Sequence, residues 1–500
     1  MGNTWGYLLG IDVGGTAVKV CLFDLSGQLL AKYAADVPVL TPRPGWAEID
    51  PNHWFRHIAQ GIHYVLKQGR VSPDQVVALG LSNMIGTVVP LDKKGAPLRP
   101  AIAYFDTRSA AEAEWILDKA PEIPRISANR VISGNTTVAS ILWIRRYEPE
   151  IYKQSALFAQ TGTLLFRWLT GETAVDWTNA SFMGIFDYRR KDWNSDVAAK
   201  LDLDLELFAP VEPPHRVAPL CAKVARELGL CPRTLVALGG IDGAMSSLGV
   251  GAIHEGDAFD VSGTSEMIAV CLSKPVLCPE LLARWHVVPD VWVLIGAIST
   301  SGAAWRWFSS LFGGTQDADL YERMTNEAAM APPGANGVIF LPHLMGERAP
   351  IWNSHARGVF FGLSLSTTRG DLARAVMEGT AYTLYWIMEL IQRYGGVSFR
   401  RVVMAGGAAR NRLWRQIKAD VWNVEVAFAG VEESSALGAA LAAGVGAGIY
   451  ADYEEAVRRA VPQPKDPVFP DPSRHQVYER GYQIYRRLYP ALSDLWHLAF

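Results

Sequence analysis

The sequence predicts an α/β protein of two domains that face each other across a cleft. Its 500 residues exceed the roughly 250 to 300 residues at which a single hydrophobic core stops growing. A similar order of strands and helices occurs twice, and glycine-rich turns follow strands at corresponding points of both halves. We therefore expect one domain over residues 1–250 and a second over residues 251–500, with the cleft between them as the place for ligands.

The first half opens with three short apolar strands over residues 7–37. They are separated by Gly14-Gly15 and by Asp24-Leu25-Ser26-Gly27, and both segments have turn chemistry. Apolar residues then recur at helical spacing over residues 54–65, and residues 76–81 form an apolar run suited to a buried strand. The predicted order is strand, strand, strand, helix, strand.

The second half repeats this order. Strands are expected first, then a helix, a strand and a helix, in the segments 258–261, 266–271, 291–298, 384–391, 402–405 and 413–422. Two halves of like order without clear sequence identity indicate duplicated α/β domains.

Composition excludes several classes of protein. The net charge of −3 offers no basic face for a nucleic-acid backbone, so no nucleic-acid partner is expected. Five cysteines without a C-x-x-C pair argue against a disulfide framework and a zinc cluster, and favour the cytoplasm. The weakly polar stretch 436–448 is too short to cross a bilayer of about 30 Å, so we expect a soluble chain without a membrane partner.

The segment Gly10 to Lys19 predicts a phosphate cradle. Gly14 and Gly15 lie at an expected hairpin tip, where backbone N–H groups can approach an anion, with Thr16 and Lys19 beside them. An ordinary hairpin with a Gly-Gly turn is the alternative for this segment alone.

Two further turns repeat the device in the second half. Gly263 and Thr264 lie between two expected strands, and Gly406-Gly407 lies between a strand and the helix containing Asn411. Each turn alone is a weak signal. Together they favour a nucleotide held between the domains, because such a ligand needs contacts from both.

Asp242 is the candidate general base. It follows the apolar strand 235–238 and the pair Gly239-Gly240 and precedes a helical stretch, so it should project from the carboxyl end of a strand into a crevice. In phosphoryl transfer a carboxylate can accept the proton of the acceptor hydroxyl. A helix N-cap is the alternative role for this aspartate.

Asp12 is a charged residue in an otherwise apolar strand. An unpaired buried carboxylate is costly, so a partner is expected. We interpret Asp12 as a catalytic carboxylate on the metal side, holding Mg²⁺ through water. A structural salt bridge to Lys19 is the alternative.

Ordered motifs along almost the whole chain resemble the FGGY family of carbohydrate kinases, and within it the xylulokinase-like subgroup. The motifs that carry the resemblance are Pro44 to Pro51 with Trp54, Arg99 to Ile102, Asp106-Thr107-Arg108, Gly239 to Ala244, Leu341 to Leu344, Gly346 to Pro350, Arg357 to Leu363, Gly406-Gly407-Ala408, Trp414-Arg415-Gln416, Ala419-Asp420 and Ala436 to Ala440.

The resemblance implies two ribonuclease-H-like domains of the actin-like ATPase fold around a catalytic cleft. It also implies ATP-dependent phosphorylation of a hydroxyl group on a small sugar or polyol, with ATP and Mg²⁺ as cofactors. By this likeness Asp242 is the catalytic base. The residues facing the phosphates would be Gly14, Gly15, Thr16, Lys19, Gly263 and Thr264, and those facing the nucleoside would be Gly302, Gly406, Gly407 and Asn411.

The chain departs from the family pattern at the expected sugar site. The usual Gln-Met-His-Gly segment is here Asn83-Met84-Ile85-Gly86, so the histidine is missing and D-xylulose is in doubt. Ile85 faces either the sugar or the core. We expect Asn83, Met84 and Asp106 to contact the sugar together with Asp242, and Glu347 and Arg348 to be structural.

Rival readings lack their supporting features. A chaperone ATPase would need a separate peptide-binding domain, for which this chain has no spare residues. A repressor-type glucokinase would show a Cys/His zinc site, which the cysteine spacing argues against. A P-loop kinase would show a Walker A sequence, and none occurs. Gly444 to Gly448 lies in a helical stretch and does not open a dinucleotide-binding unit. A catalytically silent sugar sensor is the remaining alternative. The identity of the sugar, the hydroxyl that is phosphorylated, the oligomeric state (a homodimer among others) and allosteric regulation stay open.

Overall fold

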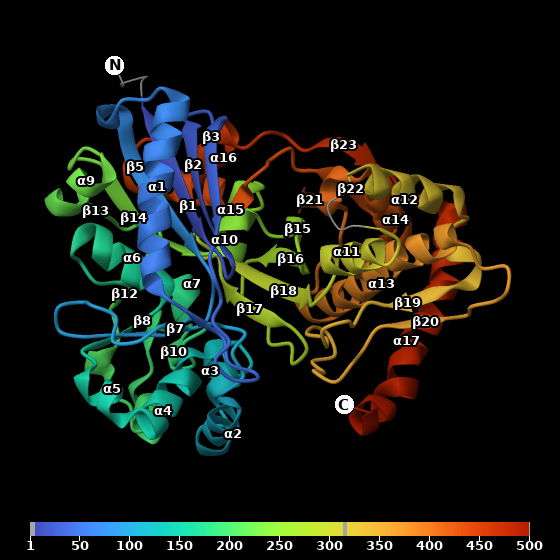
Figure 1. Ribbon diagram of the computed structural model, residues 1–500, viewed down its shortest axis with the longest axis horizontal. Helices are drawn as coiled ribbons and strands as arrows, with labels where there is room; N and C mark the ends of the chain where they lie inside the picture. Colours follow the sequence, from blue (N-terminus) through green and yellow to red (C-terminus); the bar gives the residue numbers. More distant parts are fainter. Residues whose placement is uncertain (1–5, 314–317, 500) are drawn as a thin grey trace.

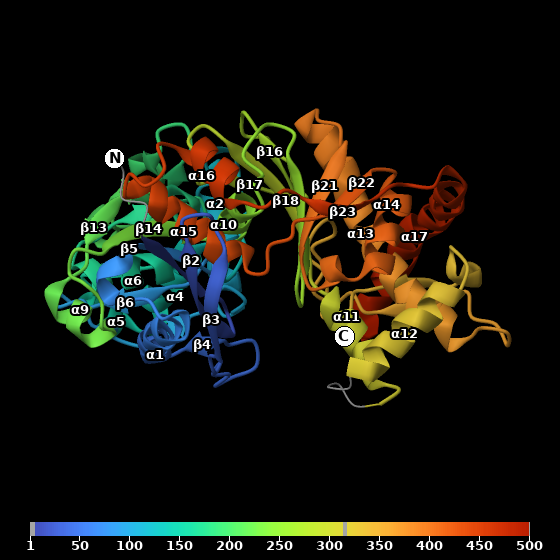
Figure 2. The same ribbon diagram turned by 90° about the horizontal axis from the view of Figure 1, so that it is seen from above.

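The computed structural model describes residues 6–313 and 318–499. It consists of two α/β bodies side by side, the first drawn from blue to green and the second from yellow-green to red (Figure 1). Each body is built on one large mixed sheet, in the order β13-β14-β5-β1-β2-β3 in the first and β17-β18-β16-β15-β21-β22-β23 in the second. Helices cover the sheets, as the view from above also shows (Figure 2).

The first sheet contains β1 (Tyr7–Val13), β2 (Ala17–Asp24), β3 (Leu29–Asp36), β5 (Val76–Asn83), β13 (Val217–Pro219) and β14 (Leu235–Ile241). The helices of this half are α1 (Pro51–Gly69), α2 (Ala110–Lys119), α3 (Ile123–Ser127), α4 (Thr137–Tyr147), α5 (Pro149–Gln154), α6 (Thr161–Thr170), α7 (Trp177–Ala180), α8 (Ser195–Lys200), α9 (Ala222–Leu228) and α10 (Asp242–Gly249). Short strand pairs join β4 (Glu48–Ile49) to β7 (Ala101–Ile102), β6 (Val89–Leu91) to β8 (Leu157–Ala159), β9 (Val175–Asp176) to β12 (Val211–Glu212), and β10 (Phe186–Asp187) to β11 (Asp192–Trp193).

The second sheet contains β15 (Ala258–Ser262), β16 (Glu266–Leu272), β17 (Leu282–Trp285), β18 (Trp292–Ile298), β21 (Arg401–Gly406), β22 (Glu425–Phe428) and β23 (Lys465–Val468), and β19 (Ile339–Leu341) pairs with β20 (Val359–Phe361) outside it. The helices of this half are α11 (Gly302–Ser310), α12 (Ala318–Met330), α13 (Arg369–Gly395), α14 (Arg412–Trp422), α15 (Ser434–Gly446), α16 (Tyr453–Ala460) and α17 (Pro472–Ala499).

Local sequence explains the first helix. The side chain of Asp50 accepts a hydrogen bond from the backbone N–H of Asn52 at 3.0 Å, and Pro51 occupies the first turn, where it loses no helical hydrogen bond. Trp54 and Ile58 belong to a buried stripe that packs on β2 and β3. The helix ends where Arg70 takes the left-handed conformation.

The two sheets have the same internal order, as predicted. In the first, β1 is antiparallel to β2 and parallel to β5, and β14 is parallel to β5. In the second, β15 is antiparallel to β16 and parallel to β21, and β22 is parallel to β21. The duplicated arrangement therefore places the β1–β2 and β15–β16 hairpins at equivalent positions.

Two features differ from the expected organisation. Strand β17 was not predicted, yet it pairs antiparallel with β18 and contacts α7 of the first half. Helices α15 and α16 lie in the sequence between β22 and β23 of the second sheet, but α15 packs on β1, β5 and α10 of the first body (Figures 1 and 2). A single cut at residue 250 therefore separates α15 from the sheet that it covers, because the chain returns to the first body after β22.

Among the described residues, no helix has both the length and the apolar character that crossing a bilayer requires.

Candidate active site

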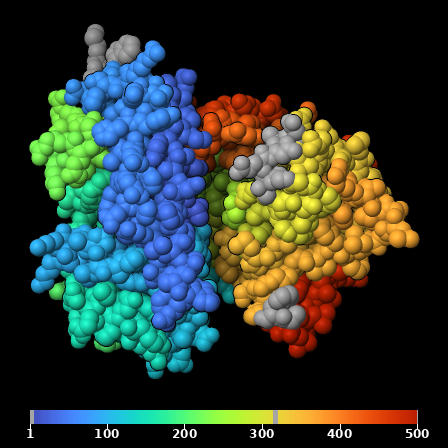
Figure 3. Space-filling model, viewed as in Figure 1, coloured from blue at the N-terminus to red at the C-terminus, as the bar shows by residue number. Residues whose placement is uncertain are grey.

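A cavity of about 350 Å³ lies between the two sheets and is lined by residues of both halves. The molecular surface is hollowed between the blue first half and the yellow and orange second half (Figure 3). The first half contributes Lys19, Ile85, Tyr104 and Asp242, among others, and the second contributes residues of β15 to β18 and of the loop before α15. The cavity thus combines charged and apolar walls.

Asp242 lies at the carboxyl end of β14, as predicted, and is the first residue of α10. Ile241 occupies the N-cap position, so the structure does not give Asp242 the alternative role of N-cap. The preceding Gly239 has φ +76°, and a Cβ there would lie 1.8 Å from the backbone oxygen of Leu81. A register shift between Ala237 and Gly240 follows from this conformation and helps aim Asp242 at the cavity.

The surroundings of Asp242 raise the pKa of its carboxyl group. Loss of hydration inside the protein is the largest cause, and the positive charge of Arg284, the N–H of Gly243 and the charge of Arg348 oppose it. The N–H of Gly243 donates to Asp242 Oδ1 at 2.6 Å. The side chain remains accessible from the cavity, so it can meet a ligand there. A carboxyl group that is accessible to a ligand and has a raised pKa is suited to take up a proton.

Asp12 lies on β1 and is partly exposed, and it is not among the residues that line the cavity. Burial raises its pKa to about 6, the hydrogen bond from Ser82 lowers it, and the nearby charge of Asp242 raises it. The Ser82 hydroxyl donates to Asp12 Oδ1 at 2.7 Å. The two candidate catalytic carboxylates are therefore close enough to influence each other's charge.

The alternative that Asp12 forms a salt bridge with Lys19 is wrong. The two residues are cross-strand partners in the β1–β2 ladder, but the Nζ of Lys19 binds Glu433 Oε2 at 2.7 Å. Within the described part of the chain, no group of three or more His, Cys, Asp or Glu residues could hold a metal ion. A single carboxylate still suits Mg²⁺, which keeps several waters and takes its other ligands from substrate phosphates.

The glycine-rich turns lie at strand ends around the cleft. Gly14 closes the β1–β2 hairpin by donating its N–H to Ala17 O at 2.9 Å, and Thr16 is exposed beside it. On the opposite body Gly263 and Gly406 line the cavity. The N–H of Gly407 donates to Ser262 O at 3.1 Å, which fixes this turn against β15.

The structure brings three predicted residues of the second half together. Gly302 begins α11, and its N–H donates to Gly263 O at 3.2 Å. Thr264 lies in the same turn and accepts a hydrogen bond from Arg306 at 2.9 Å. Asn411 lies apart as the N-cap of α14, with Oδ1 accepting from the N–H of Trp414 at 3.2 Å. Its side chain is thus already used by the helix.

None of the three residues expected beside Asp242 as sugar contacts lines the cavity. Met84 is 1% exposed, and the buried Asn83 donates from Nδ2 to Gly240 O at 3.0 Å, linking β5 to β14. Asp106 is buried and accepts from the N–H of Ala47 at 2.5 Å and from Arg108 Nη2 at 2.7 Å. In this structure these three side chains are packed behind the residues that line the cavity. Ile85, whose orientation was open, lines the cavity.

Two arginines, Arg284 and Arg348, line the cavity near Asp242, and Arg284 was not predicted. Glu347 has the expected structural role, since it pairs with His343 at 2.9 Å. Arg348, also expected to be structural, donates to Ile298 O at 2.8 Å and in addition borders the cavity. A charged residue inside the short apolar strand β17 was the signal that could have identified Arg284.

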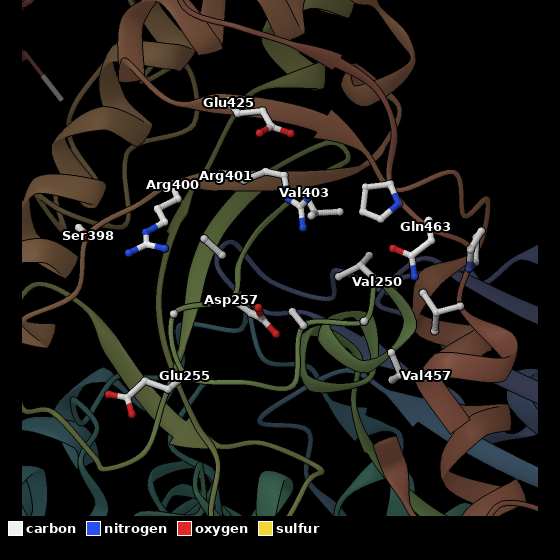
Figure 4. Close-up of a pocket in the computed structure, with 17 residues that line it drawn as sticks. Val250, Glu255, Asp257, Ser398, Arg400, Arg401, Val403, Glu425, Val457 and Gln463 are labelled. Atoms are coloured by element: carbon white, nitrogen blue, oxygen red, sulfur yellow. The ribbon is translucent and has the colours of Figure 1, made fainter. Parts of the chain in front are cut away.

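A second cavity of about 540 Å³ lies away from these residues (Figure 4). Its charged walls come from Glu255, Asp257, Arg400, Arg401 and Glu425, and it also borders residues 250–258 and 461–464, where the chain passes from the first body to the second. None of the predicted site residues lines it. The candidate active site is therefore the smaller cavity with Asp242.

Comparison with known proteins agrees with this architecture. The chain is 30% identical to the xylulose kinase of Staphylococcus epidermidis over 98% of this chain and 97% of that protein. It is 28% identical to the gluconokinase of Bacillus subtilis over 98% and 96% of the two chains. The crystal structure of ligand-bound xylulose kinase from Lactobacillus acidophilus superposes with a TM-score of 0.91 at 25% identity, covering 99% of this chain and all of that one.

The predicted fold class, two α/β domains of the actin-like ATPase type, is thereby confirmed. The models of the N-terminal and C-terminal domains of the FGGY carbohydrate kinases match residues 7–249 and 259–447. Since these matches cover most of the sequence in the expected order, the chain belongs to the FGGY family of carbohydrate kinases.

Proposed function

We propose that this kinase transfers the γ-phosphoryl group of ATP to a hydroxyl of a small sugar or polyol, with Asp242 as general base. The observation that carries the proposal is the position of Asp242. It borders a cavity that also contains Gly263 and Gly406 of the opposite domain. A phosphate donor held by the glycine turns and an acceptor held in the cavity would meet at this carboxylate.

In the proposed reaction Asp242 accepts the proton of the acceptor hydroxyl. The hydroxyl oxygen attacks the γ-phosphorus, the bond between the β- and γ-phosphates breaks, and ADP leaves with its electron pair. Because the pKa of Asp242 is raised, the ionised form is a stronger base than an exposed aspartate, while Arg284 and Arg348 limit the rise. Activity should fall as the pH drops through this pKa.

The phosphate side is assigned to the β1–β2 hairpin and its counterpart. Gly15, Thr16 and Thr264 would offer backbone N–H groups and hydroxyls at the tips of the β1–β2 and β15–β16 hairpins. The N–H groups of Gly14 and Gly263 close these hairpins instead, since they donate to Ala17 O and Ser265 O. Lys19 adds a positive charge that Glu433 holds in place. Gly302, Gly406 and Gly407 would border the nucleoside, since a glycine lets it approach the backbone.

Asp12 fits a magnesium site. Asp12 Oδ1 accepts from the Ser82 hydroxyl, and no described residue donates a hydrogen bond to Oδ2, so this oxygen is left for another ligand. Asp12 would therefore hold Mg²⁺ through water. When bound, Mg²⁺ neutralises the negative charge of the phosphates.

The proposed function is tested by substrate-dependent ADP release. The protein is incubated with ATP, Mg²⁺ and members of a panel of ketopentoses, deoxyhexoses, tetritols, glycerol and aldonates, and the products are analysed by mass spectrometry. The matched proteins are named xylulose kinases and gluconokinases, so short polyhydroxy compounds form the panel. We expect ADP and a phosphorylated product in equal amounts with at least one compound.

Two outcomes would contradict the proposal. Hydrolysis of ATP at the same rate with and without every compound would indicate an ATPase. Binding of a sugar without any phosphorylated product would indicate the sensor alternative, in which the protein binds its ligand but does not react with it.

A further inference from the structure

Arg284 is a buried cation without a hydrogen-bonding partner at two of its nitrogens. It lies on β17 with 4% of its surface exposed, and its Nε and Nη2 have no partner among the described residues. Burial lowers its pKa to about 10, so it still carries its charge at neutral pH. These two nitrogens are buried atoms, but the guanidinium as a whole lines the cavity, so an anionic ligand in the cavity would offset the cost of its buried charge.

The guanidinium lies against the helix start that carries Asp242. A Cβ added at Gly243 would lie 2.4 Å from Arg284 Nη2, and Arg284 lines the same cavity as Asp242. Its charge acts on the pKa of Asp242, but the two side chains form no ion pair within the described ranges. The proposed base therefore does not supply Arg284 with a directly bound counter-ion.

Arg348 adds a second positive charge to the same end of the cavity. One of its nitrogens donates to the backbone oxygen of Ile298 at 2.8 Å, and it has no ion pair with a carboxylate in the part of the chain that the structure describes. Two guanidinium groups thus act on the single carboxylate of Asp242. The charges at the other end are already paired, because Lys19 and Lys32 bind Glu433 at 2.7 Å each.

Part of the cavity wall is apolar, with Ile85, Phe182, Leu282, Ile295 and Trp352, and the rest includes polar residues such as Asn135 and Ser246. A neutral polyol would leave both guanidinium groups without an anion in direct contact, since neither forms an ion pair with a described carboxylate. A carboxylate supplies one negative charge and two acceptor oxygens that suit the planar donors of a guanidinium. A phosphate ester would place roughly two negative charges next to the carboxylate of Asp242, and the stronger repulsion makes it a less suitable ligand.

We propose that the acceptor substrate is a small polyhydroxy carboxylic acid whose carboxylate binds Arg284, with Arg348 beside it. The inference rests on the proposed kinase function and names its substrate class. The carboxylate stays unchanged in the reaction, while a hydroxyl of the same molecule loses its proton to Asp242 and receives the phosphoryl group. Arg284 is thus a specificity-determining residue, and the apolar Ile85 faces the carbon chain.

The test compares aldonates of four to six carbons with the alditols and aldoses of the same length. For the wild-type protein we expect kcat/KM for the best aldonate to exceed that of its neutral counterpart by about 10²-fold or more. The aldonate should also raise the melting temperature in the absence of ATP, which reports binding without turnover.

Arg284→Met removes the charge and keeps an unbranched side chain of similar reach. We expect it to lower kcat/KM for the aldonate about 10²-fold, mainly through KM, and to lower that for neutral compounds far less. Both are compared on the high-pH plateau of each protein, because the change also raises the pKa of Asp242. The ligand-free variant should melt no lower than the wild type, because an unpaired buried charge is gone. Arg284→Lys should retain part of the preference. Arg145→Met, outside the cavity, is the control.

Failure of this inference is distinguishable from failure of the kinase function. A neutral compound that is phosphorylated more efficiently than every aldonate overturns the substrate class and leaves the kinase function intact. An equal loss for charged and neutral substrates in Arg284→Met, with a shifted pH profile, would show that Arg284 only tunes Asp242. If Arg284→Met does not fold, the substrate class is tested by the aldonate preference of Arg284→Lys and by the substrate panel with the wild-type protein. No phosphorylated product from any compound would reject both proposals.

Discussion

Asp12 shows how a single side chain links folding to ligand binding. It lies half-buried on β1 and has the Ser82 hydroxyl as a hydrogen-bond donor, and loss of hydration raises the pKa of its carboxyl group from 3.8 to about 6. The folded protein therefore holds this proton more tightly than the unfolded chain does. The resulting contribution to stability is full below pH 3.8 and is lost as the pH rises through about 6. At neutral pH Asp12 destabilises the ligand-free protein.

Asp12→Asn should reverse this effect. The amide oxygen can still accept from Ser82 and carries no charge, so the ligand-free variant should be more stable than the wild type at pH 8. The gain is at most about 3 kcal/mol and should vanish near pH 4. With ATP and Mg²⁺ the order should reverse, because only the carboxylate can hold the metal ion. Thermal melting of the wild type and the variant across pH, with and without the nucleotide, measures the stability gain and its reversal.

A melting temperature of Asp12→Asn that equals that of the wild type at every pH would contradict this role. Asp118→Asn, on the exposed face of α2, is the control for a change of charge alone.

At the residue scale the sequence predicts buried charges better than it predicts contacts. Asp12 and Asp242 were recognisable because a charge interrupts an apolar strand or follows one. Arg284 has the same signal within β17 but was missed, because that short strand was not recognised. Asn83 and Met84 were chosen from a family segment, and the direction in which a strand end turns its side chains depends on neighbouring strands that the segment does not contain.

At the scale of elements, α15 determines how α10 presents Asp242. A Cβ at Gly438 of α15 would lie 1.9 Å from the backbone oxygen of Met245 on α10. The two helices therefore pack with their backbones almost in contact. The small residues of α15, which look merely weakly polar in the sequence, allow this approach between β1, β5 and α10.

Gly438→Ala should separate these helices. Alanine favours a helix over glycine by about 1 kcal/mol, but the clash with backbone atoms should outweigh this and destabilise the protein by about 1 to 3 kcal/mol. Turnover should fall as well, since α10 carries Asp242. Urea unfolding and steady-state kinetics measure the two effects.

Gly395→Ala is the matched control for this prediction. Gly395 is also helical, and its added Cβ would meet nothing nearer than 3.6 Å, so this change should be nearly neutral. Equal stability of both variants would contradict the close packing of α15 on α10.

Periodicity predicted most of the elements that build the two sheets, because apolar alternation and turn residues are local signals. It could not predict where α15 lies. The helical character of residues 436–448 was visible, but its return to the first body depends on contacts with residues such as Gly10 and Gly80, far away in the sequence. The prediction of a single domain boundary at residue 250 therefore could not include the return of α15 to the first body.

At the scale of the whole molecule, two sheets of like order converge on one cavity (Figures 1 and 3). The first body supplies Asp12 and Asp242, and the second supplies Gly263, Gly406 and the two arginines. Neither body alone contains both the glycine turns that face each other and the base. Duplication of the fold thus explains why the proposed phosphate donor and acceptor sites face one another.

The central claim is that Asp242 is the base at the meeting point of the two domains, and turnover by Asp242→Asn tests it most directly. With the best substrate of the panel, kcat should fall by about 10² to 10⁴-fold, because the amide is nearly isosteric but cannot take the proton. Calorimetry should find the affinities for ATP and for the substrate within about threefold of the wild type. A variant that binds both ligands and keeps more than roughly a tenth of the wild-type turnover would contradict the account.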